Sequence, residues 1–191
     1  MASTTAIKDV GETLVNLFKS KMGLDIVLGS PGEIKEESKL SLFLFQILEN
    51  IHLKNKEVQQ IDSGKLKYPP LPLDLYYMLT AHFPQETTDK TYDAHLLLGK
   101  AMQILHDNAI LTVPDLYGSL KNSIDELHIS LNPMKLEDIT NIWNTFQDKS
   151  YKPSVCYVVT PVNIESARPP EAVTRVVSEE IKYVGLVPLV K

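Results

Sequence analysis

The sequence contains a single cysteine, Cys156, among its 191 residues. One thiol cannot form an intrachain disulfide or a thiolate-rich metal site, so both are excluded, and the count fits a reducing compartment. Cys156 lies in an apolar run, which predicts a buried and unreactive thiol.

Long apolar runs are also missing. No stretch approaches the ~18 consecutive apolar residues of a transmembrane helix, so we expect no membrane insertion. Residues 1–21 lack the apolar core of a signal peptide. If the protein leaves the cell, we expect it to do so without a conventional secretion signal.

Basic clusters are absent as well. The 19 lysines and arginines are scattered along the chain and are outnumbered by 24 acidic residues, which gives a net charge of -5. A nucleic-acid-binding surface needs concentrated positive charge. We therefore expect no nucleic-acid partner.

Apolar residues make up 43% of the chain, enough for the core of one domain. Apolar positions at helical spacing predict three amphipathic helices, at residues 7–22, 90–107 and 136–146. Gly23 is placed to end the first helix, and Trp143 on the third is expected in the core rather than at an interface.

Alternating or β-branched patterns predict about seven strands around these helices. Residues 39–50 are apolar on both alternating faces, which predicts a central strand covered on both sides. Residues 52–67 are polar and the prolines of 68–72 disfavour helix, so this part is expected to be a loop. The remaining strands are predicted within residues 25–29, 73–82, 124–133, 151–164 and 172–190.

The helices are separated by runs of strands, which indicates an α+β fold with a mainly antiparallel sheet packed against about three helices. Residues 1–168 are expected to form one domain. Residues 169–191 are expected to be either a β-rich C-terminal arm or the final strands of the same domain.

Two residue pairs in the second helix invite a chemical interpretation. Gly99-Lys100 lacks the upstream glycine, the following Ser or Thr and the strand-to-helix position of a phosphate loop. Gly99 is better explained by the close approach of another element. His106 and Asp107 are neighbours on a helix and project about 100° apart, so they cannot form a catalytic pair directly, and a helix-ending cap is favoured.

No other constellation carries chemistry. The histidines show no zinc-site spacing, and no nucleophile elbow or paired carboxylates occur. We predict no catalytic residue, no metal site and no cofactor. The histidines are His52, His82, His95, His106 and His128.

The combination of segments is more informative than any single motif. Four segments stand out, at residues 70–82, 95–111, 129–143 and 151–166. In order and spacing, they resemble the N-terminal domain of the tail-terminator, or cap, proteins of contractile injection systems of the antifeeding-prophage and Photorhabdus virulence cassette type. The resemblance covers about residues 5–168. Lys135, where relatives more often have a capping Ser or Thr, and Pro153 depart from the pattern.

The resemblance implies a structural role without catalysis. Such a domain forms a homohexameric ring at the tail end distal to the baseplate, stops growth of the inner tube and anchors the last ring of the sheath. Its partners are then other copies of itself, the inner tube protein and the sheath protein. It is assembled in the bacterial cytoplasm as part of a phage-tail-like particle, released or retained.

Candidate interface residues lie on one strand and in the C-terminal segment. Asp74 and Tyr76 point away from the apolar face of the strand predicted at 73–82. The stretches 173–177 and 183–187 are expected to form an arm that pairs with a neighbour, although ordinary intramolecular strands explain the pattern equally well. The arm candidates are Val173, Arg175, Val177, Tyr183 and Leu186.

Two other functions stay open at this point. A phage-like adaptor, such as a head-tail joint, is consistent with the same fold pattern. An enzyme that uses His106 or His95 in a cleft ranks last, because no nucleophile, metal set or oxyanion device accompanies either histidine.

Overall fold

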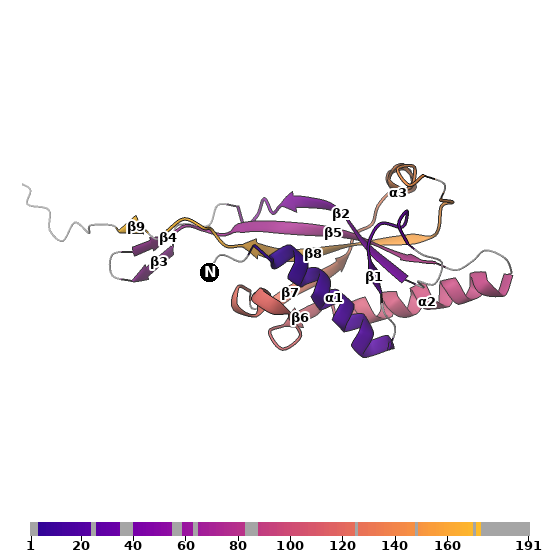
Figure 1. Cartoon of the computed structure of the whole chain (residues 1–191), viewed down its shortest axis with the longest axis horizontal. Coiled ribbons are helices and arrows are strands. Elements are labelled where there is room, and N and C mark those ends of the chain that lie inside the picture. Colours follow the sequence, from indigo (N-terminus) through magenta and orange to yellow (C-terminus); the bar gives the residue numbers. More distant parts are fainter. Residues whose placement is uncertain are drawn as a thin grey trace, which may run out of the picture.

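The structure is a computed structural model (Figure 1). It describes residues 4–23, 26–34, 40–54, 59–62, 65–82, 88–124, 126–147, 149–169 and 171–172.

A six-stranded sheet forms the body of the molecule. All its neighbouring strands are antiparallel except β1 and β2, which are parallel. The predicted α+β fold with a mainly antiparallel sheet is therefore confirmed. In spatial order the strands are β1 (Val27–Leu28), β2 (Leu40–Glu49), β5 (Leu71–Ala81), β8 (Ser154–Ile164), β7 (Glu126–Leu131) and β6 (Ile110–Thr112).

Helices cover both faces of this sheet, and three α-helices are present in the described residues, as predicted. The helices α1 (Ala6–Met22) and α2 (Thr88–Asp107) and the 3-10 helix η1 (Gly118–Asn122) share the main core with β5. The short helix α3 (Leu136–Trp143) lies on the opposite face (Figure 1). No described helix has the length and apolarity that a membrane crossing requires.

The alternation predicted for residues 73–82 is confirmed in β5. Leu75, Tyr77 and Leu79 are buried under α1 and α2, while Met78 points to the other face and packs with Trp143 and Cys156. Both Trp143 and Cys156 are buried, as expected, and burial raises the pKa of the Cys156 thiol to about 11.

Gly23 ends α1 as predicted. Its φ of 63° lies in the left-handed region, and its backbone N–H donates to the carbonyl of Lys19 at 3.0 Å. This backbone conformation is readily available to glycine and costs other residues free energy.

The strand β2 is not the fully covered central strand that its sequence predicts. Only the two-residue strand β1 lies outside it, opposite Ser41 and Leu42. A register shift between Leu44 and Gln46 marks a bulge, and the strand becomes exposed beyond it. The apolar character of the second half therefore does not reflect burial by the described residues.

The loop predicted at residues 52–67 is also wrong in part. The strands β3 (Gln59–Asp62) and β4 (Lys65–Lys67) pair antiparallel, and β9 (Glu171–Ala172) adds a third strand. The third strand comes from about 100 residues further along the chain, so tertiary pairing overrides the weak local signal.

The predicted C-terminal segment is described only at its start. There, β9 pairs with β4 of the same chain. All five arm candidates lie outside the described residues, so the arm and the domain division at residue 168 stay predictions. These candidates are Val173, Arg175, Val177, Tyr183 and Leu186.

Candidate assembly surfaces

The residues that first suggested chemistry are structural or lie in solvent. Gly99 and Lys100 are exposed on α2, and a Cβ added at Gly99 would meet nothing within 4 Å. The expected close approach at Gly99 is therefore wrong, because this position faces open space. At the helix end, Asn108 donates its backbone N–H (3.0 Å) and its side-chain amide (2.8 Å) to the carbonyl of Ile104, which confirms the predicted cap.

One histidine is buried. The Nε2 atom of His82 lies 2.6 Å from the hydroxyl oxygen of Ser41. Burial, together with the charges of Lys152 and Lys149, lowers the pKa of His82 to about 4, so the ring is neutral at pH 7. Within the described part of the chain, no group of three His, Cys, Asp or Glu side chains is placed to hold a metal.

The two candidates on β5 are already engaged within the chain. Asp74 accepts hydrogen bonds from the side-chain amide of Asn50 at 2.8 Å and from the hydroxyl of Thr160. The ring of Tyr76 packs against Phe45, with centroids 6.3 Å apart. Both side chains are half-buried, and their proposed interface role stays a prediction.

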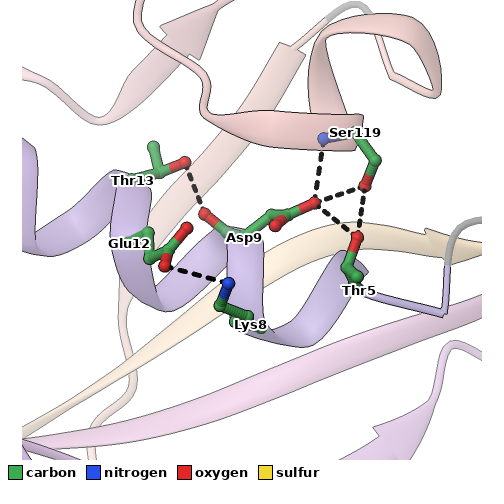
Figure 2. Close-up of polar contacts among 6 residues, drawn as sticks. All are labelled: Thr5, Lys8, Asp9, Glu12, Thr13 and Ser119. Carbon is green, nitrogen blue, oxygen red and sulfur yellow. Dashed lines mark hydrogen bonds and ion pairs between the residues drawn. The ribbon is translucent and has the colours of Figure 1, made fainter.

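A buried carboxylate fastens α1 to η1 (Figure 2). Asp9 accepts hydrogen bonds from the Thr5 hydroxyl at 2.8 Å, from the Ser119 N–H at 2.9 Å and from the Ser119 hydroxyl. Burial acts to raise the pKa of Asp9, but these hydrogen bonds and nearby Lys8 bring it below its ordinary value. On the next turn, Thr13 donates to the Asp9 carbonyl and accepts the N–H of Tyr117 at 3.0 Å.

We call these contacts of Asp9 with Thr5 and Ser119 the Asp9 clip. The Asp9 clip requires glycine at position 118. Gly118 has a φ of +58°, and a Cβ there would lie 2.6 Å from the Asp9 carboxyl carbon. The sequence alone does not predict this contact between Asp9 and Ser119. Its only signal is that Asp9 and Thr13, four residues apart, are polar on the helix face that carries the apolar stripe.

A projecting arm extends the central strand pair beyond the body (Figure 1). We define this arm as β3, β4 and β9, because β4 leads into β5 and β8 leads into β9. At its base, Lys67 forms an ion pair with Glu165 at 2.5 Å, and the Arg168 guanidinium lies 4.9 Å from the centre of the Tyr68 ring. These contacts join the two connecting segments.

The outer edge of β2 is open along its second half. Within the described residues, no strand pairs with this edge between Phe43 and Glu49. Ile47 and Leu48 are 43% and 44% exposed. An unpaired edge with apolar side chains is a site for the addition of a strand from another chain. We call residues 43–49 the open β2 edge.

A groove begins where β1 ends. It is formed by Ile7 and Gly11 of α1, Leu28 of β1, and Phe43 and Leu44 of β2, with a volume of about 620 Å³. A Cβ at Gly11 would lie 2.9 Å from a methyl carbon of Leu28, so the glycine lets Leu28 lie against the helix. We call this cavity the α1–β2 groove.

The opposite edge of the sheet is short. β6 has three residues, with Ile110 exposed, and the following turn exposes Val113 and Tyr117. The two edges therefore present unlike surfaces.

Comparison with known families identifies the fold. A model of the Pvc16 N-terminal domain matches residues 9–178. The chain belongs to the Pvc16 N-terminal domain family. The resemblance to cap proteins is thus confirmed, and no curated protein sequence matches the chain.

Two solved structures share the fold of this Pvc16 N-terminal domain. One is the PVC sheath/tube terminator of an extracellular contractile injection system in its extended state, with a TM-score of 0.62 and 17% identity over 95% of this chain. The other is the tube-terminating cap of the anti-feeding prophage, with a TM-score of 0.67 and 18% identity over 92% of this chain. The chain spans 65% and 61% of their respective lengths.

Proposed function

We propose that this protein is a cap of a phage-tail-like contractile injection system, which ends the inner tube and anchors the last sheath ring. The observation that carries the proposal is the family match over residues 9–178, together with the similarity in fold to two terminators. Both solved relatives are terminators, which favours this role over a head-tail adaptor.

The protein acts by assembly rather than by catalysis, as a homohexameric ring that contacts the tube and sheath proteins. A ring of identical subunits needs two different surfaces on each subunit. The open β2 edge and the short β6 edge meet this requirement. The ring is assembled in the bacterial cytoplasm and leaves the cell, if at all, as part of the particle.

Electron microscopy of particles assembled without this protein tests the proposal. We expect tubes and sheaths of uncontrolled length, or sheath lost from the end distal to the baseplate. Expression of the protein from a plasmid serves as the control and is expected to restore a single length. Particles of normal length with an intact sheath in its absence would contradict the proposal.

Truncation tests the C-terminal segment separately. Because β9 pairs with β4 inside the chain, a stop after Arg168 also removes an internal strand. A stop after Ala172 leaves β9 in place and removes only residues 173–191. If particles with this shorter protein keep normal length and sheath attachment, the C-terminal segment has no role in assembly.

A further inference from the structure

The open β2 edge and the α1–β2 groove are adjacent. Phe43 and Leu44 line the groove, and the unpaired edge continues from them to Glu49. A strand added to this edge therefore extends the line of β1, and its inward side chains enter the groove between α1 and the sheet.

The charge of the groove favours an occupant with a basic side chain. Glu12 and Glu33 line it with Lys8 as the one basic residue, and Lys8 is paired with one oxygen of Glu12 at 3.2 Å (Figure 2). The other oxygen, Oε2, is buried and accepts no hydrogen bond from the described part of the chain. A buried carboxylate oxygen without a donor costs free energy that an arriving guanidinium offsets.

One segment of this chain matches both requirements. Residues 173–177 read Val-Thr-Arg-Val-Val, in which Arg175 lies between β-branched residues. β-branched residues favour an extended strand, and alternation places Arg175 on one face and Val176 on the other. A strand of this sequence brings one cation and apolar side chains to an apolar groove with excess negative charge.

The direction of β9 determines which copy supplies the segment. β4 runs toward the body into β5, and β9 is antiparallel to β4, so β9 runs outward along the projecting arm (Figure 1). Residues 173–177 extend at most ~17 Å. A chain that leaves Ala172 outward must reverse within this length to reach its own groove, whereas it needs no reversal to reach a subunit placed beyond the end of the projecting arm.

We propose that residues 173–177 of one subunit add a strand to the open β2 edge of the next subunit, with Arg175 paired to Glu12 in the α1–β2 groove. This inference rests on the proposed ring function and names one of its subunit contacts. The contact is heterologous, since residues 173–177 and the α1–β2 groove are different surfaces, and it repeats around a closed ring.

Crosslinking within assembled particles tests which chain occupies the edge. Two tagged forms of the full chain are co-expressed, one with Gln46→Cys on the open edge and the other with Val176→Cys. The native Cys156 is buried, so it does not compete. We expect a disulfide between the two forms, and none when Lys100→Cys on the exposed face of α2 replaces Gln46→Cys.

Other crosslinking results overturn the proposal. A chain that carries both cysteines and crosslinks only within itself shows that the segment folds onto its own groove. A crosslink from Gln46→Cys to a sheath subunit, or no crosslink, shows that a copy of this segment does not occupy the edge.

A charge swap tests the ion pair. We expect Glu12→Arg and Arg175→Glu each to lower the amount of this protein retained on purified particles by at least about tenfold, because each leaves two like charges face to face. The double variant restores retention to within about threefold of the original. Asp93→Arg, which makes the same charge change on exposed α2, is the matched control.

Thermal unfolding of each variant separates lost assembly from lost folding. Single variants that fold normally and stay fully retained overturn the ion pair, as does a folded double variant without rescue. If particles without the protein still lose length control in any of these cases, the cap function stands and only this subunit contact is wrong.

Discussion

The two halves of β2 have similar apolar sequences but different environments. Leu40 and Leu42 in the first half are 1% and 2% exposed, whereas Ile47 and Leu48 in the second half are more than 40% exposed. Leu40 and Leu42 belong to the main core that α1 shares, and β1 pairs only with this half, whereas Ile47 and Leu48 belong to neither core cluster of the described residues. Apolar sequence indicates that a surface is to be covered, and it does not state which chain covers it.

This comparison predicts that substitutions in covered regions reduce stability, whereas substitutions in the open half reduce assembly. Leu40→Ala is expected to lower the free energy of unfolding by about 3 kcal/mol, because it leaves a cavity in the core. Leu48→Ala, the same substitution in the open half, is expected to cost about 0.5 kcal/mol. Chemical denaturation measures both losses, and equal losses would show that the two halves of β2 contribute equally to stability.

The pH dependence of the free energy of unfolding tests the covered region, because His82 is buried there. Its pKa is 6.5 when unfolded and about 4 when folded, so the unfolded state binds more protons between these values. The free energy of unfolding is therefore expected to fall by roughly 3 kcal/mol as the pH drops from 6.5 to 4. The protonation of His82 in the unfolded state is lost in His82→Gln, so a pH dependence that persists unchanged in this variant contradicts the assignment.

The Asp9 clip offers a matched glycine pair. Gly118→Ala is expected to cost about 2 kcal/mol, because the new Cβ meets the Asp9 carboxylate at a left-handed backbone position. Gly99→Ala, in open space on α2, is expected to stabilise the protein by about 0.5 to 1 kcal/mol. Thermal melts of both variants check the prediction, which fails if the two shifts have the same sign.

The smallest effect on stability is expected in the open half. Leu48→Lys places a charge on an exposed strand edge, which changes the free energy of unfolding by about 0.5 kcal/mol or less. The same lysine opposes strand addition. We expect normal denaturation curves and reduced retention on particles, measured as the amount of protein per purified particle.

Much of the body was predictable from local patterns. Leu75, Tyr77 and Leu79 alternate, and Leu97, Leu98 and Leu105 recur at helical spacing, because each of these faces is buried within one chain. The patterns of β5 and α2 therefore needed no knowledge of distant segments.

The remaining features depend on tertiary partners. The strands β3 and β4 carry little local signal, and β9 lies about 100 residues beyond them. The packing role predicted for Gly99 is excluded by its place on the exposed side of α2. The α1–β2 groove combines Gly11, Leu28 and Phe43 from three elements, so no single stretch of sequence predicts it.

Hydrogen exchange of the backbone amides tests most directly the claim that the open half of β2 is an assembly surface. The exchange of residues 40–49 is compared between the isolated protein and the assembled particle. We expect exchange to slow at residues 43–49 on assembly and to stay slow in both states at residues 40–42. Equal exchange of residues 43–49 in the two states would contradict this claim.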